Sequence, residues 1–568
     1  MRLPGIAAGS ALCLAACSSL PPGPPSPASY PRTRAERTGY LETSRYADVT
    51  QFLDSLTRLR APIIVGSIGK TNEGRDIPYV IASRPLVSTP AQAKALGRPI
   101  VYVQANIHAG EIEGKEALLA LIRDLTFSAS PNALDSIVLI AVPIYNADGN
   151  ERFASQSVNR REQNGPEMVG TRANAQNLDL NRDYVKAEAP ETRASLAMFN
   201  AWDPDVFVDL HTTDGSFHGY ALTYSPSLSP AAVFGGVYAR DSLLPVLRER
   251  MRTRDGFEVF DYGNFVDDEP GLVADSSVHQ GWATYDSRPR FGTNYFGIRG
   301  RIAILSEAYS HDTLQRRVAS TYAFVKEILS LVAERSAAIR SLSARADSLP
   351  MAWGRSPDSV QMVAIRSELI ATPKMVDVIR EDLEKTGDSS LTQPGVPRGE
   401  RRTGRFRTIR MPVYDRFTST LDRLPPAAYV IAPEDGAVAA LLRLHGLRVD
   451  ESDSAWTARG ESFVIDSVVT NQRAFQGHHE VRLKGHWERG IQSLAAKSFI
   501  VSTAQPRGAL AVYLLEPESD DGLTTWNFFD PQLQKGGRYP VRRIFDLRRG
   551  RGAAQKRSSV SSDRSPEN

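Results

Sequence analysis

Histidine and acidic side chains follow directly on an apolar segment near residue 105. The run PIVYVQA, residues 99–105, has the composition of a buried strand, and the stretch after it, NIHAGEIEGKEA, holds His108, Glu111, Glu113 and Glu116. An imidazole beside a carboxylate suits a bound cation, whereas carboxylates alone also suit the first turn of a helix. The spacing alone does not show which of these acids binds a cation and which begins a helix.

A second histidine ends another apolar run. His211 closes PDVFVDLH, residues 204–211, and Asp214 stands three residues further on. Such His–acid spacing also arises by chance in a chain with 65 acidic residues among 568. The position is the stronger signal, because ligands in open α/β sheets collect at the carboxyl ends of the strands. We therefore expect His108, Glu111 and His211 to converge on one cation.

A third apolar run ends in a carboxylate. GRIAILSE, residues 300–307, finishes at Glu307, whose desolvation is costly unless a partner or a function compensates it. Zinc in hydrolytic sites takes three protein ligands from His and Asp or Glu, and it lowers the pKa of its water from 15.7 to roughly 7. Such a site also needs a general base, and Glu307 is the candidate.

The segments around these residues alternate between strand and helix patterns from about residue 37 to residue 349. Apolar runs of strand length are interleaved with stretches at helical spacing, such as GKEALLALIRDL, residues 114–125. Strands in which nearly every residue is apolar are typical of sheets covered on both faces. The pattern predicts an α/β fold with helices on both faces of the sheet, closed by one long helix over residues 321–349.

Five motifs in order, NIHAGEIEG, PIYNADGNERF, TRANAQNLDLNRDY, VDLHTTDG and LSEAYS, resemble those of the zinc carboxypeptidases related to carboxypeptidase A. The resemblance covers about residues 40–330. It implies a mixed sheet flanked by helices on both faces and one Zn²⁺ bound by His108, Glu111 and His211. It also implies that Glu307 acts as general base and proton shuttle.

The resemblance extends to residues that would bind the substrate. Arg172 resembles the arginine that polarises the scissile carbonyl, and Asn181 and Arg182 resemble the clamp on the terminal carboxylate. The planar guanidinium of an arginine binds a carboxylate bidentately, as an exopeptidase requires. Tyr285 resembles the tyrosine that closes over the substrate, with Tyr295 as a competing candidate.

Several polar residues next to the motifs have alternative uses. Asp179 either supports the first histidine ligand or has a purely structural role. Asp214 and His218 are expected to be local turn and surface residues, with lining of the site as the alternative. Glu113 and Glu116 are expected to begin a helix, where acidic side chains interact favourably with the helix dipole.

The first twenty residues predict export. They contain Arg2, a short apolar stretch and both cysteines of the chain, Cys13 and Cys17. LAAC, residues 14–17, resembles a bacterial lipobox, and the proline-rich PPGPPSPASYP follows it; the alternative is an ordinary cleaved signal peptide with a chance cysteine. We expect a periplasmic or cell-surface protein anchored to a bacterial membrane by a lipid at Cys17; Ser18 favours the outer membrane, but which membrane holds the anchor is left open. No disulfide or cysteine metal site is expected in the mature fold.

The chain is too long for one ordinary domain. We expect a lipoprotein signal peptide (1–17), a proline-rich tether (18–39), a zinc carboxypeptidase-like catalytic domain (40–350), a helical and polar connector (351–410), a smaller C-terminal α/β and β-rich domain (411–548) and a disordered basic tail (549–568). The digestive enzymes that the motifs resemble lack such a C-terminal extension, and no role is predicted for it.

Composition excludes several classes of function. Hydrophobic residues make up 41% of the chain, enough to bury real cores, and the formal net charge is +3 with basic residues spread along the sequence. Nucleic-acid binding is therefore not expected, and no later stretch approaches the ~20 apolar residues of a spanning helix. Four arginines in DSRPRFGTNYFGIRGR, residues 286–301, leave open whether acidic C-terminal residues are preferred.

The leading prediction is a zinc metallocarboxypeptidase that hydrolyses C-terminal residues from peptides with a free terminal carboxylate. One alternative is a related zinc amidohydrolase acting on cell-wall peptides or N-acyl amino acids. Another is a non-catalytic lipoprotein that uses the cleft, or the C-terminal domain, for binding; retention of all three ligands and of the base argues against it. Neither the side-chain preference nor the oligomeric state is predicted.

Overall fold

The computed structural model describes residues 29–546 apart from 130, 270, 276, 354–360, 373 and 394. The predicted signal peptide with Cys17, residues 18–28 of the predicted tether and the predicted tail (549–568) lie outside the described residues. Within the described part of the chain, no helix has the length and apolar character needed to cross a membrane.

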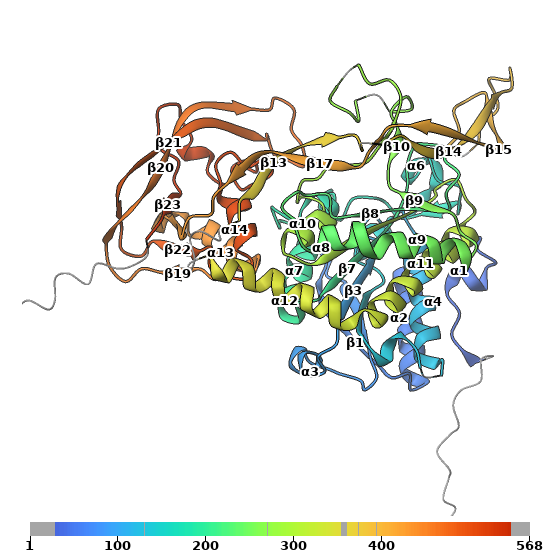
Figure 1. The fold of residues 1–568 in the computed structure, drawn as a ribbon. Coiled ribbons are helices and arrows are strands. Elements are labelled where there is room, and N and C mark those ends of the chain that lie inside the picture. The colour runs from blue at the N-terminus through green and yellow to red at the C-terminus, as the bar shows by residue number, and fades with distance from the viewer. Residues whose placement is uncertain are drawn as a thin grey trace, which may run out of the picture.

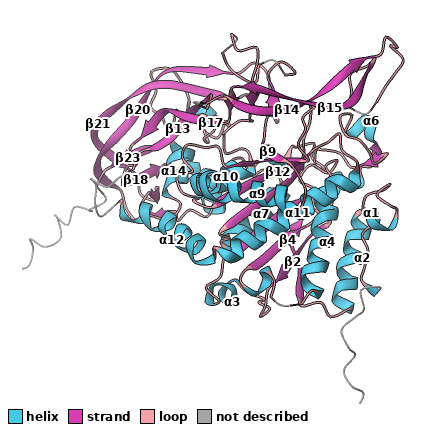
Figure 2. Ribbon diagram, turned by 45° about the vertical axis from the view of Figure 1, so that its right-hand side comes forward, coloured by secondary structure: helices cyan, strands magenta, loops and turns pink. Residues whose placement is uncertain are grey.

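An eight-stranded mixed sheet forms the centre of the predicted catalytic domain (Figures 1 and 2). In spatial order its strands are β1 (Ile63–Lys70), β2 (Asp76–Ala82), β4 (Val138–Val142), β3 (Ile100–Ala105), β7 (Val206–Thr212), β12 (Ile302–Ala308), β8 (Leu222–Pro226) and β9 (Val259–Asp261). β4, β3, β7 and β12 run parallel at the centre, whereas β2 pairs antiparallel with β4 and β8 pairs antiparallel with β12. The expected mixed α/β fold is confirmed.

Helices cover both faces of this sheet, as the apolar runs predict (Figure 2). On one face, α2 (Tyr46–Arg58), α4 (Glu113–Phe127) and α11 (Leu314–Glu334) bury apolar side chains against the strands. On the other face, α7 (Pro190–Trp202) and α10 (Gly292–Ile298) do the same. Successive strand residues point to opposite faces, so both sets must be apolar when both faces are covered.

The long helix predicted over residues 321–349 is wrong as a single element. α11 ends at Glu334, and α12 (Ser336–Ala352) begins after Arg335, whose φ of −105° and ψ of 20° leave the helical region. The Arg335 guanidinium donates to the backbone carbonyl of Ser242, 2.9 Å away, which holds the break in place. α11 stays on the sheet, while α12 runs on toward the C-terminal domain (Figure 1).

The predicted connector, residues 351–410, contains long strands and is not a helical, polar linker. β13 (Val363–Ile370) pairs with β17 (Arg416–Arg423), and β14 (Val376–Lys385) pairs with β15 (Glu400–Met411) in a second antiparallel ribbon. The charged residues that suggested a linker form cross-strand ion pairs in the second ribbon: Arg401–Glu384, Arg402–Glu381, Arg407–Asp382 and Arg410–Asp377. Opposite charges facing one another across antiparallel strands stabilise the pairing.

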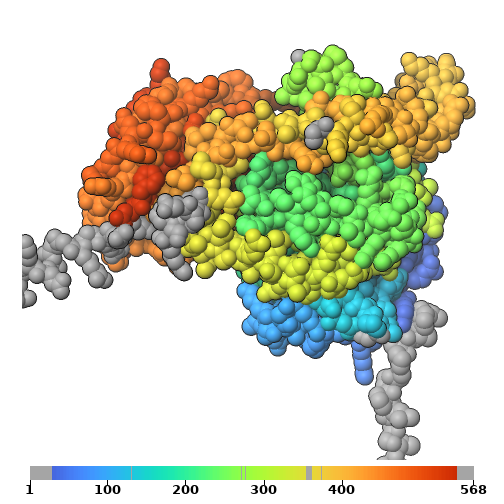
Figure 3. Space-filling model, viewed as in Figure 1, coloured from blue at the N-terminus to red at the C-terminus, as the bar shows by residue number. Residues whose placement is uncertain are grey.

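A six-stranded sheet with two helices forms the C-terminal region beside the catalytic domain (Figures 1 and 3). In spatial order its strands are β19 (Asp450–Glu451), β22 (Phe499–Ser502), β18 (Ala428–Ile431), β23 (Arg542–Ile544), β20 (Trp456–Thr470) and β21 (Val481–Leu494). Its helices are α13 (Gly436–Leu444) and α14 (Gly508–Leu515). Their buried side chains belong to the same apolar cluster as those of α7 and α10, so the two regions share one continuous core.

Further α-helices and strands, mostly short, lie in the described chain. They are α1 (Arg34–Arg37), α3 (Pro90–Ala95), α5 (Ala147–Glu151), α6 (Gln156–Asn159), α8 (Gly235–Tyr238), α9 (Leu244–Thr253), β5 (Ala154–Ser155), β6 (Met168–Val169), β10 (Asn264–Phe265), β11 (Trp282–Ala283) and β16 (Val413–Tyr414).

The N-terminal segment folds onto the start of α4. α1 lies inside the predicted tether, which therefore gives way to folded structure earlier than expected. As predicted, Glu113 and Glu116 lie in the first turn of α4. The buried Glu116 carboxylate also accepts hydrogen bonds from the Thr43 hydroxyl at 2.9 Å and from the Ser44 N–H and hydroxyl at 2.6 and 3.1 Å. This carboxylate joins the N-terminal segment to the helix.

Replacing Glu116 with alanine is expected to lower the free energy of unfolding by about 3 kcal/mol, because several buried donors lose their acceptor. Denaturant unfolding of the full chain measures the change. Glu42→Ala is the matched control: Glu42 pairs with Arg34 at the surface of the same segment, where such pairs contribute at most about 1 kcal/mol. Equal stability of the Glu116→Ala protein and the wild type would contradict the assignment.

Candidate metal centre and active site

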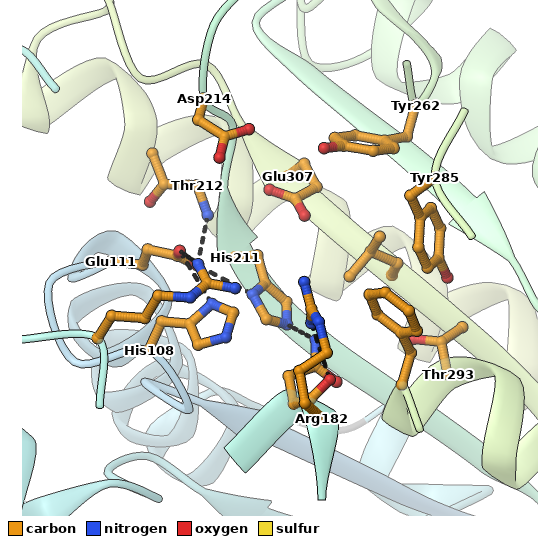
Figure 4. A pocket seen from close by; sticks show the side chains of 14 residues that line it. His108, Glu111, Arg182, His211, Thr212, Asp214, Tyr262, Tyr285, Thr293 and Glu307 are labelled. Atoms are coloured by element: carbon orange, nitrogen blue, oxygen red, sulfur yellow. Dashed lines mark hydrogen bonds and ion pairs between the residues drawn. The ribbon is translucent and has the colours of Figure 1, made fainter. Parts of the chain in front are cut away.

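Two imidazoles and one carboxylate converge where β3 and β7 end. His108 and Glu111 lie in the loop between β3 and α4, and His211 lies near the end of β7. Nδ1 of His108 is 3.0 Å from Oε1 of Glu111, and Nδ1 of His211 is 2.9 Å from Oε2. One ligand atom from each residue lies within 4.8 Å of the other two. Figure 4 shows the three side chains facing a common point.

The second nitrogen of each imidazole is held by an aspartate. Nε2 of His108 is 3.0 Å from Oδ1 of Asp179, and Nε2 of His211 is 3.2 Å from Oδ2 of Asp209. A proton on Nε2 of His108 satisfies Asp179, and a proton on Nε2 in each ring leaves the Nδ1 lone pair free to bind a metal. Two such lone pairs facing one carboxylate place three electron-rich atoms together, so the residues fit a divalent cation. A His₂Glu set is typical of zinc hydrolases.

The electrostatics of the site also favour positive charge. Burial opposes protonation of His211, yet the carboxylates of Asp209 and Glu111 raise its pKa well above the ordinary value. Burial alone would raise the pKa of Glu111, but His108 and Arg160 hold that pKa well below its usual range. The carboxylate is therefore ionised and ready to bind a cation.

Arg160 supports Glu111 from the other side. Its NH1 lies 3.1 Å from Oε1 of Glu111, and its NH2 donates to the backbone carbonyls of Thr212 and Thr213 at 3.2 and 3.0 Å. The guanidinium is buried, and it joins the ligand loop to the end of β7. The sequence offered no signal for Arg160, because it stands in a polar loop far from any strand pattern.

Glu307 lies beside the ligands because of the strand register. In the parallel pair of β12 and β7, Glu307 stands directly opposite His211. Burial raises the pKa of Glu307 well above its usual value; His211 opposes this shift, and Glu111 and Asp214 add to it. The carboxyl group lines the same pocket as the three candidate ligands (Figure 4).

Four further predicted residues line this pocket: Arg172, Asn181, Arg182 and Tyr285. Arg172 donates through Nε to Oδ2 of Asp179 at 2.9 Å, and the Asn181 side-chain oxygen accepts from the Gly292 N–H at 2.9 Å. The Arg182 guanidinium lies over the ring of Phe291, 4.0 Å from its centroid. The pocket therefore has an arginine near the candidate ligands and another beside an aromatic wall.

The competing tyrosine does not reach the pocket. Tyr295, a residue of α10, is fully buried in the core, and its hydroxyl is 2.7 Å from Nδ1 of His445 in the C-terminal region. Tyr285 instead packs edge-to-face against Tyr262 and Phe291 at the pocket wall. The structure thus brings Tyr285, and not Tyr295, to the site.

The expectation that His218 is a surface residue is wrong, and the structure agrees with both alternatives for Asp214. His218 is 1% exposed and packs between Tyr309 and Trp282, and burial lowers its pKa to about 3. The reason is that β14 covers it, through a bridge between His218 and Arg380. Asp214 is exposed as expected, but it also lines the pocket.

Asp209 was missed although a signal existed. It is an isolated acid in the apolar run of β7, two residues before His211. Residues two apart share one face of a strand, so an aspartate at this position points the same way as the ligand. The open question about Asp179 is answered by contact, since its carboxylate bonds both His108 and Arg172.

Replacing His211 with alanine is expected to reduce zinc binding by more than the 10- to 100-fold typical of residues that only support a ligand. Zinc content per chain, measured by elemental analysis after dialysis, should fall from about one to near zero. His486→Ala, at an exposed histidine of β21, is the control and should keep its zinc. Full zinc occupancy in the His211→Ala protein would rule this site out.

Comparison with known proteins agrees with the site. Residues 49–234 match the family model for zinc carboxypeptidases. Carboxypeptidase 2 of Trichophyton tonsurans is 23% identical over 507 residues, which cover 84% of this chain and 81% of that protein. Carboxypeptidase Z of Mus musculus is 33% identical over 124 residues, covering 21% of this chain and 17% of its own.

Solved structures were also compared. A metallo-carboxypeptidase from Burkholderia cenocepacia aligns with a TM-score of 0.37 and 17% identity, over 50% of this chain and 69% of that one. A score this low adds nothing to the fold, which rests on the sheet order and register above. The family match, the mixed sheet and the convergent His–Glu–His group agree with one another. Over residues 49–234 the chain is similar to the zinc carboxypeptidases.

Proposed function

We propose that this protein removes C-terminal residues from peptides, with His108, Glu111 and His211 as zinc ligands and Glu307 as general base. The observation that carries the proposal is that the three ligands, the buried acid and two arginines line one pocket. Bound zinc supplies Lewis-acid chemistry, which polarises a carbonyl and acidifies water.

Glu307 is suited to accept and return a proton. Its buried position raises its pKa well above the usual value of a carboxylic acid, which is the direction that favours a general base. It stands beside His211 in the strand register, so a water molecule near the ligands is within its reach. Glu307 can then pass the same proton to the leaving amine, so that one carboxyl group serves first as base and then as acid.

Arg182 and Asn181 are proposed to hold the terminal carboxylate. Arg182 is nearly buried, and burial lowers its pKa, but a guanidinium stays charged in proteins and binds carboxylates through two parallel hydrogen bonds. Arg172 lies nearer the ligands, with NH1 3.5 Å from Oε1 of Glu111, where it can stabilise the oxygen of the scissile carbonyl.

Tyr285 is proposed to close over the bound substrate. Its hydroxyl is buried at the pocket wall and has no hydrogen-bond partner among the described residues. A buried hydroxyl without a partner is costly, and a substrate amide or carboxylate would satisfy it.

The C-terminal side chain of the substrate is proposed to be uncharged. The arginines of residues 286–301 are engaged outside the pocket, in pairs or hydrogen bonds with Asp286 (Arg288), Asp521 (Arg290), Asn200 (Arg299) and Asp347 (Arg301). Tyr262, Phe291, Thr293 and Leu305 also line the pocket. Such a wall suits an aliphatic or aromatic side chain and offers no cation to an acidic one.

We also propose that the protein is exported and anchored by a lipid at Cys17. The support is the N-terminal sequence alone, since LAAC precedes a proline-rich segment. Metabolic labelling with a fatty acid, compared between the wild type and Cys17→Ala, tests this anchor.

Replacing Glu307 with glutamine is expected to lower kcat/KM for peptide hydrolysis by about 10²–10⁴-fold, because general-base catalysis is lost. Zinc content should be unchanged, since Glu307 is not among the converging ligands. The measurement is release of free amino acid from a synthetic peptide, alongside elemental analysis. A Glu307→Gln enzyme with wild-type activity would overturn the proposed mechanism.

A peptide-library digest followed by mass spectrometry tests the reaction itself. The wild type should shorten peptides one residue at a time from a free C-terminus, prefer uncharged terminal residues and stop when a chelator is added. Peptides with an amidated C-terminus should be cleaved about 10²-fold less well, because Arg182 loses its anionic partner. Internal cleavage, or equal cleavage of amidated peptides, would exclude a carboxypeptidase.

Arg182→Ala should remove the discrimination between free and amidated C-termini. Arg193→Ala, at an exposed arginine of α7, is the matched control and should keep it.

A further inference from the structure

One turn of the C-terminal sheet reaches the segment that supports the metal site. β20 and β21 are joined by residues 471–480, NQRAFQGHHE, and these residues contact the catalytic domain. The side-chain oxygen of Gln476 accepts a hydrogen bond from the backbone N–H of Asp179 at 2.9 Å. The donor and acceptor are 297 positions apart in the sequence.

The backbone at Gln476 is shaped to make this contact. Phe475 and His478 exchange two backbone hydrogen bonds, at 2.8 and 3.0 Å, around a two-residue turn. Gln476 and Gly477 have φ values of +51° and +81°, as a type I′ turn requires at both central positions. Asparagine and glycine are the residues favoured there, so a glutamine occupies the turn at a conformational cost. Strain of this kind tends to persist where a contact has a use.

The Asp179 carboxylate forms hydrogen bonds with several groups of the proposed active site. Its Oδ1 bonds Nε2 of His108 and accepts from the Asn181 N–H at 2.9 Å, while its Oδ2 accepts from Nε of Arg172. A shift of this residue would move one candidate ligand, the carbonyl-polarising arginine and the start of the carboxylate clamp together.

The same connection also supports the opposite wall of the pocket. Arg290 precedes Phe291, and its guanidinium bonds Glu480 at 2.7 Å and the buried Asp521. The Phe475 ring lies 5.3 Å from that guanidinium. His478 reaches Glu188, 2.9 Å away, in the chain that follows the clamp. The β20–β21 connection therefore touches both segments that border the pocket.

We propose that Gln476 is a positioning residue for the metal site and that, through it, the C-terminal region forms part of the active centre. The inference rests on the zinc peptidase function proposed above. Gln476 acts on the ligand through Asp179 and has no contact with the reacting atoms. The role of the C-terminal region is then to keep His108, Arg172 and the clamp in register.

The test separates the contact from the stability of the turn. Asparagine and glycine both suit the positive φ at position 476, so Gln476→Asn and Gln476→Gly should leave the melting temperature of the full chain unchanged or higher. Neither side chain reaches the Asp179 N–H as glutamine does. Gln472→Ala, at an exposed residue of the same connection, is the matched control.

Two readouts are measured for each protein. Zinc affinity, by competition with a chromophoric chelator, should fall on the order of 10-fold in both Gln476 variants, as for other residues that orient a ligand. KM for a peptide should rise as well, because the clamp begins two residues after Asp179. The Gln472→Ala protein should match the wild type in both.

Wild-type zinc affinity and kcat/KM in both Gln476 variants would overturn the proposal. The zinc measurement needs no peptide, so the two proposals can fail separately. Weakened zinc binding in variants of a wild type that cleaves no peptide would uphold the positioning role and reject the peptidase function.

Discussion

The burial of the Glu111 carboxylate is the constraint on which the site depends. An acid removed from water is unstable as an anion unless positive or donor groups surround it. Here the Arg160 guanidinium faces one of its oxygens, the Thr212 backbone N–H donates to the other, and its pKa stays low despite burial. The ends of β3 and β7 bring these groups together, and the helices on both faces of the sheet keep water from the strands beneath them.

Much of the site was predictable because its members stand at strand ends. His108, His211 and Glu307 each follow an apolar run, and the sheet order places those runs side by side. Arg160 and Gln476 were not predictable. Each acts through contacts made between segments far apart in the sequence, and no periodicity in a single sequence shows which of these segments will meet.

Some parts of the fold could likewise be predicted from the sequence, and others could not. The alternation of apolar runs and helical spacing predicted the central sheet and its covered faces, because burial on both sides demands it. The break between α11 and α12 at Arg335 could not be predicted, since the helical spacing of apolar residues continues through it in the sequence. The charged residues of β14 and β15 look like those of a linker in the sequence, because the sequence does not show which residues they face on the opposite strand. Pairing depends on register, which composition does not contain.

The C-terminal region changes how the molecule divides into parts. Its apolar side chains belong to the same core as those of α7 and α10. Its polar groups contact the Tyr295 hydroxyl, the Asp179 backbone N–H and the Arg290 guanidinium. The alignment with the Trichophyton tonsurans protein covers 84% of this chain and so continues well beyond residue 234, where the family match ends. A domain boundary near residue 350 therefore divides the sequence, but the two regions on either side of it share one core and are not separate structural units.

The direct pairing of Glu307 with His211 also limits how such a chain can change over evolutionary time. Side chains alternate between the two faces of a strand, so the insertion or deletion of one residue within β7 or β12, before the pair, would turn the acid or the imidazole to the opposite face. Length variation in descendants of this gene should therefore accumulate in loops. Within these two strands, only changes of an even number of residues would keep both groups on their shared side.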